Sequence, residues 1–158
     1  MRSWYLLCHK AGLENFNRAC LSLRQQQHIE IFTPVITTRR KRTDRPGFRE
    51  LQEPLFYGYL FVATDFEVVH SSALEESPGV SHFVRHGQTI KAVPEYVMAE
   101  ILALPASQPE EQALRRAQRH RRRASTNALR ERICKLATIP ERGIRSALFL
   151  ALVESTYR

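Results

Sequence analysis

Hydrophobic and polar positions in the first 37 residues follow first a strand period, then a helix period. Ser3–Cys8 is rich in aromatic and aliphatic residues and alternates weakly, which predicts a strand. After Ala11-Gly12, apolar residues recur at helical spacing at Leu13, Phe16, Ala19, Cys20 and Leu23. Ile29–Thr37 predicts a second strand, and Pro34 within it indicates an edge strand or a bulge.

Four aromatic residues fall within six positions of the segment Glu53–Val62. They predict a strand over Pro54–Ala63 with rings on both faces. A strand buries only one face in its own core when its sheet is covered on one side, because successive side chains point to opposite faces. Tyr59 and Phe61 share one face, and the residues between and beyond them take the other. We therefore expect the face of Tyr59 and Phe61 to be a docking surface for another protein.

Three further elements complete the N-terminal region. Val68–Leu74 predicts a short helix, Gly79–Arg85 a strand, and Pro94–Leu104 a helix with apolar residues on one side. The expected order is strand, helix, strand, strand, helix, strand, helix. Such an order predicts an α+β fold, in which helices back an antiparallel sheet.

The C-terminal region has helical composition throughout. Glu110–Leu136 consists mainly of good helix formers, and Ser125-Thr-Asn127 is placed to interrupt and recap the helix. Pro140–Gly143 predicts a turn, and Ile144–Thr156 predicts another helix. The expected α-hairpin has an apolar face made of Ile133, Leu136, Leu148, Leu152 and Val153. Helices of this length are marginal alone, so this face is expected to pack on the N-terminal domain.

Composition and charge divide the chain in the same place. Leu104–Pro109 has the composition of a linker. The net charge is +8; residues 1–109 hold 12 basic and 11 acidic groups, whereas residues 110–158 hold 12 and 5. We therefore expect a domain at 1–104, a linker at 105–112 and a helical region at 113–158.

Basic residues are concentrated in two segments. Thr37–Arg49 has five basic residues in seven positions before a Pro-Gly turn, which predicts a hairpin tip or a loop. This cluster is either a solvated loop or a site that attracts an anion, because such a density of charge repels itself. The run Leu114–Arg123 either contacts nucleic acid or is a solvated connector.

Several classes of protein are disfavoured. No apolar run approaches the ~20 residues that cross a membrane. The N-terminus has no signal-peptide core, and three widely spaced cysteines suit reduced thiols, so a cytoplasmic protein is expected. Metal-ligand spacings, a nucleophile elbow and a phosphate-binding glycine loop are all absent from the sequence, so we expect no metal, cofactor or catalytic residues.

A stand-alone basic module that binds RNA or single-stranded DNA is the alternative to a protein-docking domain. Such a module requires aromatic residues interleaved with basic residues on one surface. No Lys or Arg is adjacent to the aromatic residues at 56–61, which favours a protein partner for them.

The first 104 residues or so resemble the NusG family of transcription elongation factors, and within it the RfaH branch of antiterminators. The order and spacing of the motifs agree across most of the domain. The matching motifs are Ser3-Trp-Tyr-Leu-Leu7, Lys10, Gly12, Pro34-Val-Ile-Thr37, Glu53-Pro-Leu-Phe56, Tyr59-Leu-Phe-Val62 and Gly79-Val-Ser-His-Phe-Val-Arg85.

The resemblance implies a factor that binds RNA polymerase beside the transcription bubble and suppresses pausing, with no chemistry of its own. It implies that Tyr59 and Phe61, with Leu6 nearby, pack on the clamp helices of the largest subunit. It also implies that His70-Ser71-Ser72 contact the gate loop of the second large subunit. A monomer is expected.

The resemblance further implies contact with the non-template DNA strand in the bubble. The residues at the matching places are Lys10, Arg18, Arg24, Gln25 and Gln26. An interdomain ion pair is implied between Glu53 and Arg145. Family members carry a C-terminal β-barrel or, in the RfaH branch, an α-hairpin that masks the polymerase site. Gly143 is the only glycine after Gly87, which favours the hairpin and argues against the barrel and ribosome coupling.

Overall fold

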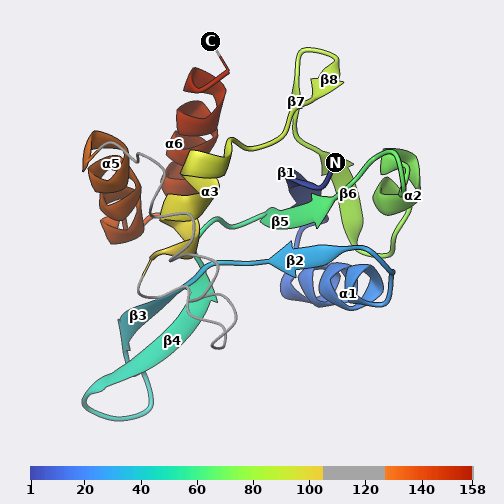
Figure 1. Ribbon diagram of the computed structural model, residues 1–158. Helices are drawn as coiled ribbons and strands as arrows, with labels where there is room; N and C mark the ends of the chain where they lie inside the picture. Colours follow the sequence, from blue (N-terminus) through green and yellow to red (C-terminus); the bar gives the residue numbers. More distant parts are fainter. Residues whose placement is uncertain (105–126, 158) are drawn as a thin grey trace.

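A computed structural model describes residues 1–104 and 127–157 of the chain. Its main sheet has four antiparallel strands in the order β2-β5-β1-β6, with β1 and β5 at the centre. The strands are β1 (Ser3–His9), β2 (Glu30–Phe32), β5 (Tyr59–Thr64) and β6 (Val80–Phe83). This is the α+β class that the sequence predicts (Figure 1).

Helices cover both faces of this sheet. The helices α1 (Leu13–Arg24) and α2 (Ser71–Glu75) lie on one face, where Leu23 and Leu74 join Leu7, Leu60 and other residues in one buried cluster. The other face is covered by α3 (Glu95–Leu102), α5 (Asn127–Thr138) and α6 (Arg142–Ser155). Because side chains alternate along β5, Phe61 packs in the cluster on one face of the sheet, and Leu60 and Val62 pack in the cluster on the other.

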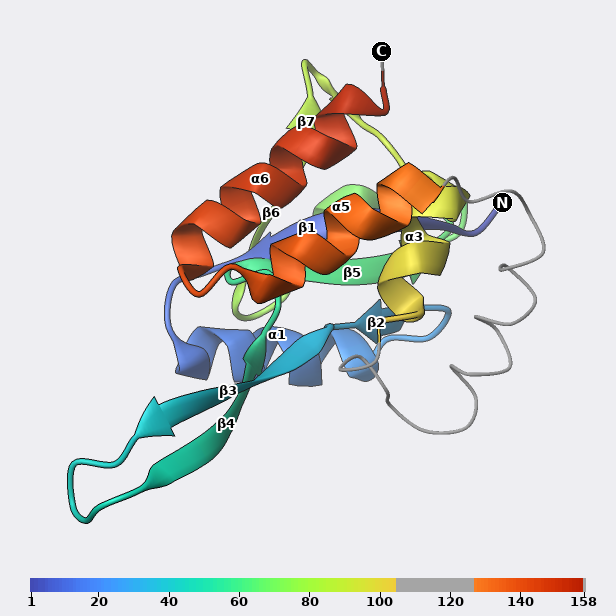
Figure 2. The same cartoon turned by 90° about the vertical axis from the view of Figure 1, so that its left-hand side faces the viewer.

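Two-stranded ribbons leave the main sheet at two places. The longer one pairs β3 (Val35–Lys41) with β4 (Phe48–Pro54), and we call these strands and their loop the arm. Figure 2 shows the arm extending away from the helices. The shorter ribbon pairs β7 (Arg85–His86) with β8 (Thr89–Ile90).

The C-terminal region forms the predicted α-hairpin, and its described residues form no barrel. Residues 139–141 connect α5 to α6, and the two helices lie side by side (Figure 2). Leu129, Ile133 and Leu136 of α5 are spaced by four and three residues, and all three are buried. The predicted linker at 105–112, the start of the helical region and the basic run Leu114–Arg123 lie outside the described residues.

Three boundary predictions were wrong for local reasons. Ile29–Thr37 is two strands in different sheets, because Pro34 has no amide hydrogen to continue the ladder. Residues 55–58 are a turn rather than strand, since Gly58 has a φ of 92°. The short helix begins at Ser71, where the His70 ring accepts a hydrogen bond from the amide of Ser72.

Two predicted core residues lie outside the core. Leu13 is 71% exposed and Leu148 is 46% exposed. Leu13 begins α1, before the helix has turned its apolar face to the sheet. On α6 the inward position next to Leu148 belongs to Phe149, which is fully buried.

Gly79 allows α1 to pack tightly against the start of β6. A Cβ atom there would lie 2.3 Å from the Asn15 carbonyl oxygen and 2.6 Å from the Ala19 nitrogen, and the φ of Gly79 is +85°. We expect Gly79→Ala to lower the free energy of unfolding by about 2 kcal/mol, because clash and backbone strain add. Urea unfolding measures this, with Gly143→Ala, which has open space around it, as the control. Equal stability of the two variants would contradict the prediction.

Candidate functional site

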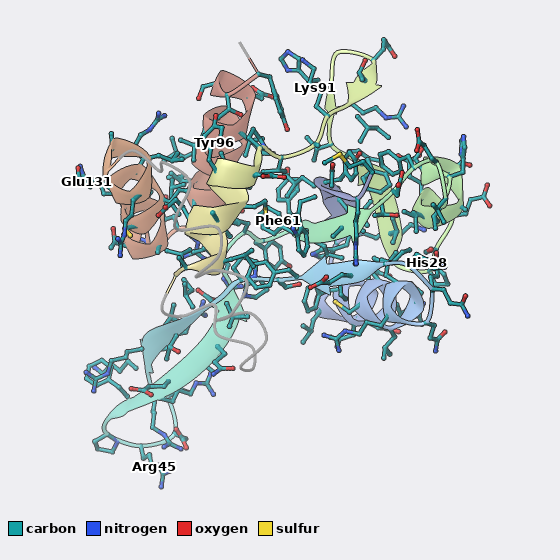
Figure 3. All side chains as sticks on the ribbon, viewed as in Figure 1. His28, Arg45, Phe61, Lys91, Tyr96 and Glu131 are labelled. Carbon is teal, nitrogen blue, oxygen red and sulfur yellow. The ribbon has the colours of Figure 1, made fainter. Side chains whose placement is uncertain are left out.

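An aromatic cluster lies where the main sheet meets the C-terminal helices. It consists of Phe32, Phe56, Phe61 and Phe149. Phe61 on β5 is flanked by Phe32 on β2 and by Leu6 on β1, which are its partners in the ladder. Phe61 is fully buried, and it lies between the sheet and the helices in Figure 3. The face that the sequence marks as a docking surface is therefore covered by the chain's own C-terminal helix.

Phe149 of α6 makes the central contact of this cover. Its ring stacks on Phe56 with centroids 3.8 Å apart and an interplanar angle of 16°. It meets Phe61 edge-on at 5.7 Å. Leu152 and Val153, one turn further along α6, belong to the same buried cluster. Aromatic pairs of this kind add about 0.5–1.5 kcal/mol each beyond the area that they bury.

Arg145 holds α6 to the turn that precedes β5. Its side chain is fully buried. The guanidinium donates hydrogen bonds to three backbone carbonyls, those of Leu55, Pro54 (3.3 Å) and Ile139 (2.8 Å). Burial lowers the pKa of Arg145, and the nearby Glu53 carboxylate opposes that effect. A buried guanidinium is tolerated here because each of its three nitrogen atoms donates a hydrogen bond.

Glu53 is the shared acceptor of an arginine cluster. Arg145 Nη2 lies 3.7 Å from Glu53 Oε1, so the ion pair that the resemblance implies is present. Arg142 of α6 also donates to Glu53 Oε2, and Arg40 of the arm lies 3.5 Å from the same oxygen. The Glu53 side chain is only 8% exposed. This one carboxylate at the base of the arm therefore links both strands of the arm to the C-terminal helix α6.

Two further contacts at each end hold α6 in place. Near its start, the Ser146 hydroxyl donates to the Tyr57 carbonyl at 3.2 Å, and the Arg142 guanidinium lies 5.8 Å from the Tyr57 ring centroid. Beyond its end, the Tyr157 hydroxyl donates to the Lys91 carbonyl at 3.4 Å, and the Lys91 ammonium lies over the Tyr157 ring. Burial raises the pKa of Tyr157. Helix α6 is thus held to the rest of the protein near its start, at its middle and just beyond its end.

Of the predicted polymerase-binding residues, three lie together at this site. Leu6 and Phe61 are opposite one another in the core under α6. Tyr59 is half-buried and packs against the same cluster. Burial raises the pKa of Tyr59, and the nearby Cys8 adds to the effect.

The other predicted polymerase contact, His70-Ser71-Ser72, lies at the start of α2 on the opposite face of the sheet. The His70 Nδ1 atom is 2.8 Å from the Ser72 hydroxyl and accepts from the Ser72 amide. His70 and Ser72 are exposed. The structure therefore separates this segment from Tyr59 and Phe61.

Three of the predicted DNA-binding residues gather around Ser77–Gly79. The amide of Lys10 donates to the Gly79 carbonyl at 2.9 Å, and the Arg18 Cβ atom also approaches Gly79. The Gln26 side-chain amide donates to the Ser77 hydroxyl at 2.7 Å. Arg18 forms an exposed salt bridge with Glu14 within α1. The remaining two, Arg24 and Gln25, are exposed at the end of α1.

The sequence reasoning missed five residues that build the site. Phe149 and Arg142 were not assigned to it, although Phe149 follows Arg145 by four residues and so shares its side of α6. Phe56 appeared only within a motif. Nothing in the sequence indicated that Arg40 and Ser146 contact residues 13 and 89 positions away.

The contacts of the site are ring packing, ion pairs and hydrogen bonds to backbone carbonyls. Within the described ranges, no group of three or more His, Cys, Asp or Glu side chains could hold a metal ion. Among the same residues, no helix is both long and apolar enough to cross a membrane.

The comparison with protein-family models identifies the family of this chain. The family model described as "Transcription termination factor nusG" matches residues 2–102. A solved structure described as "Domain interaction in Thermotoga maritima NusG" is similar over 70% of this chain, with 24% sequence identity and a TM-score of 0.43. The similar region covers 61% of that Thermotoga maritima chain.

Proposed function

The chain belongs to the NusG family of transcription factors, and from that premise we propose that it is an RfaH-like elongation and antitermination factor. It binds RNA polymerase at the transcription bubble and suppresses pausing or termination. The observation that carries this proposal is the aromatic face of the sheet, which is covered by the C-terminal helical hairpin as well as by α3. Such a face is suited to a protein partner once it is uncovered.

Leu6, Tyr59 and Phe61 form the surface that packs on the clamp helices of the largest subunit. The contacts of α6 with this surface indicate which groups the partner must supply. Removing α6 takes the donors away from the carbonyls of Pro54, Leu55 and Tyr57. A partner that replaces α6 favourably therefore brings a large apolar side chain and hydrogen-bond donors, because unpaired buried carbonyls are costly.

His70, Ser71 and Ser72 contact the gate loop of the second large subunit. Their position on the other face of the sheet supports a second, separate contact. Since His70 Nδ1 is engaged with Ser72, the free ring nitrogen of His70 and the Ser71 hydroxyl are the groups available to a partner.

Lys10, Arg18, Arg24, Gln25 and Gln26 contact non-template single-stranded DNA. The gathering of Lys10, Arg18 and Gln26 around Ser77–Gly79 supports one continuous surface. The Arg18–Glu14 salt bridge is exposed and therefore weak, so it does not prevent a phosphate contact.

The C-terminal hairpin acts as a mask on the polymerase-binding surface. In this proposal residues 1–104 are the polymerase-binding domain, residues 105–112 are the linker and residues 113–158 are the mask of a cytoplasmic monomer. Its helical packing supports a role apart from ribosome coupling.

Glu53→Ser tests the mask. This change removes the carboxylate that Arg40, Arg142 and Arg145 share, leaving the buried Arg145 without an ion pair. We expect the open population to rise and the affinity for core polymerase without DNA to increase roughly tenfold or more. Binding is measured by biolayer interferometry with immobilised core enzyme.

The matched control for Glu53→Ser is Glu50→Ser, an exposed carboxylate on the same strand, for which no increase is expected. Unchanged polymerase affinity in Glu53→Ser would contradict the mask. If neither variant nor the parent chain binds polymerase while all bind free RNA, the stand-alone nucleic-acid module is the better description.

A further inference from the structure

The outer half of the arm carries a density of positive charge that the proposed function does not use. Six of the twelve residues from 39 to 50 are basic and two are acidic. All twelve are exposed except Arg42, which is half-buried. The arm extends away from the sheet and the helices in Figures 1 and 2, and Arg45 lies at its end in Figure 3. The outer half is thus a cationic ribbon that no other element among residues 1–104 and 127–157 covers.

The strand register places like charges against one another. Arg40 lies directly opposite Arg49 in the ladder, a pairing that destabilises an isolated ribbon. Lys41 lies opposite Phe48, and the Arg39 guanidinium is 5.6 Å from the Phe48 ring centroid. Because successive residues point to opposite faces, Arg40 and Arg49 project on one side and Arg39 and Lys41 on the other. Positive charge therefore lies on both faces of the ribbon.

The acidic residues of the arm neutralise only part of this charge. Arg42 pairs with Asp44 at 3.2 Å, and Arg40 reaches back to Glu53 at the base. Within residues 1–104 and 127–157, Lys41, Arg45 and Arg49 form no salt bridge. Since the Arg39 guanidinium lies over the Phe48 ring, these three are the cations of the outer half that make neither a salt bridge nor a ring contact among the described residues.

The shape of the arm indicates which polyanion fits. Two paired strands of seven residues make a ribbon roughly 20 Å long, since a strand rises about 3.4 Å per residue. The major groove of B-form DNA, about 12 Å wide, admits a two-stranded ribbon and has phosphates along both walls. We infer that the arm binds double-stranded DNA through its major groove, with Lys41, Arg45 and Arg49 neutralising phosphates on both sides.

Other polyanions fit the arm less well. Single-stranded nucleic acid is held by several stacking rings, whereas the outer half has one aromatic residue, Phe48, with Arg39 already over its ring. The major groove of an RNA duplex is too deep and narrow for side chains to read. A membrane surface favours an apolar face opposite a basic one, and here both faces are basic.

The test uses the full chain and a variant that removes two of the cations, Lys41→Gln with Arg49→Gln. Both side chains are exposed, so the fold is expected to persist, which thermal unfolding checks. The matched control removes two exposed arginines of α5, Arg130→Gln with Arg132→Gln. The basic run at 114–123 is unchanged in both variants.

Affinity for a fluorescent DNA duplex of about 20 base pairs is measured by anisotropy over a salt series. We expect the arm variant to bind roughly tenfold more weakly than the parent at low salt, with the slope of log K against log salt reduced by about 2. The control is expected to keep most of the parent affinity and slope. The inference does not depend on polymerase binding, which is measured separately on the same variants.

Three results would overturn the inference. The first is duplex affinity in the arm variant equal to that of the parent or of the control. The second is an equal or larger loss of affinity for a single strand of the same length. The third is a loss confined to vesicles of anionic phospholipid, which would assign the arm to a membrane surface.

Discussion

Phe149→Ala is expected to reduce the free energy of unfolding by about 3–4 kcal/mol, since it removes a fully buried ring and leaves a cavity against Phe56 and Phe61. The lost stability comes from the packing of α6 on the sheet. Urea unfolding followed by circular dichroism measures the change. Increased fluorescence of a hydrophobic dye, at urea concentrations where the main sheet persists, would show that the aromatic face is uncovered.

Leu148→Ala is the matched control for Phe149→Ala, because Leu148 is the preceding residue of the same helix and is 46% exposed. We expect this control to cost no more than about 1 kcal/mol. A similar loss in both variants would mean that α6 is not held by the ring of Phe149 and would contradict the packing described above.

Arg145→Met is expected to weaken the attachment of α6 by about 3 kcal/mol, which is more than a hundredfold in the equilibrium between covered and uncovered states. Methionine keeps much of the side-chain length but leaves the carbonyls of Leu55, Pro54 and Ile139 without their donor. Hydrogen exchange of the α6 amides, read by mass spectrometry, measures the effect. The amides of β1 and β5 are expected to keep most of their protection.

Arg142→Met distinguishes the effect of the ion pair with Glu53 from that of the hydrogen bonds that Arg145 donates to backbone carbonyls. Arg142 also donates to Glu53, but its side chain is 41% exposed and it donates to no carbonyl in the described residues. We expect this variant to lose about 1 kcal/mol. If Arg142→Met opens α6 as much as Arg145→Met does, then the ion pair with Glu53, and not the carbonyl contacts, holds the helix.

Local patterns predicted most of the elements of this fold. The two-residue alternation along β5 assigned Phe61 and Leu60 to different faces, and the structure places them in different cores. The four- and three-residue spacing of α5 identified Ile133 and Leu136 as buried. These predictions succeeded because the apolar residues of each element recur with its structural period, so their spacing indicates which residues share a face.

The same reasoning failed where apolar residues surround an element. On α6, Leu148 and Phe149 are neighbours, and Ile144 on its outer side is also exposed. A helix that is apolar on several sides does not indicate from its spacing alone which side is inside. In the structure Arg145, whose guanidinium donates to the carbonyls of Pro54 and Leu55, lies on the same side of α6 as the buried Phe149.

The sequence by itself determined the class of fold, the family motifs and the presence of aromatic residues, Tyr59 and Phe61, on one face of the central strand. Only the tertiary structure decided that Arg40 and Arg142 join Arg145 at the Glu53 carboxylate, and that Phe149 is the ring that covers Phe61. The physical reason is distance along the chain. Periodicity and capping act over a few residues, whereas Glu53 and Arg142 are 89 positions apart in sequence and meet only after the sheet and helices have packed.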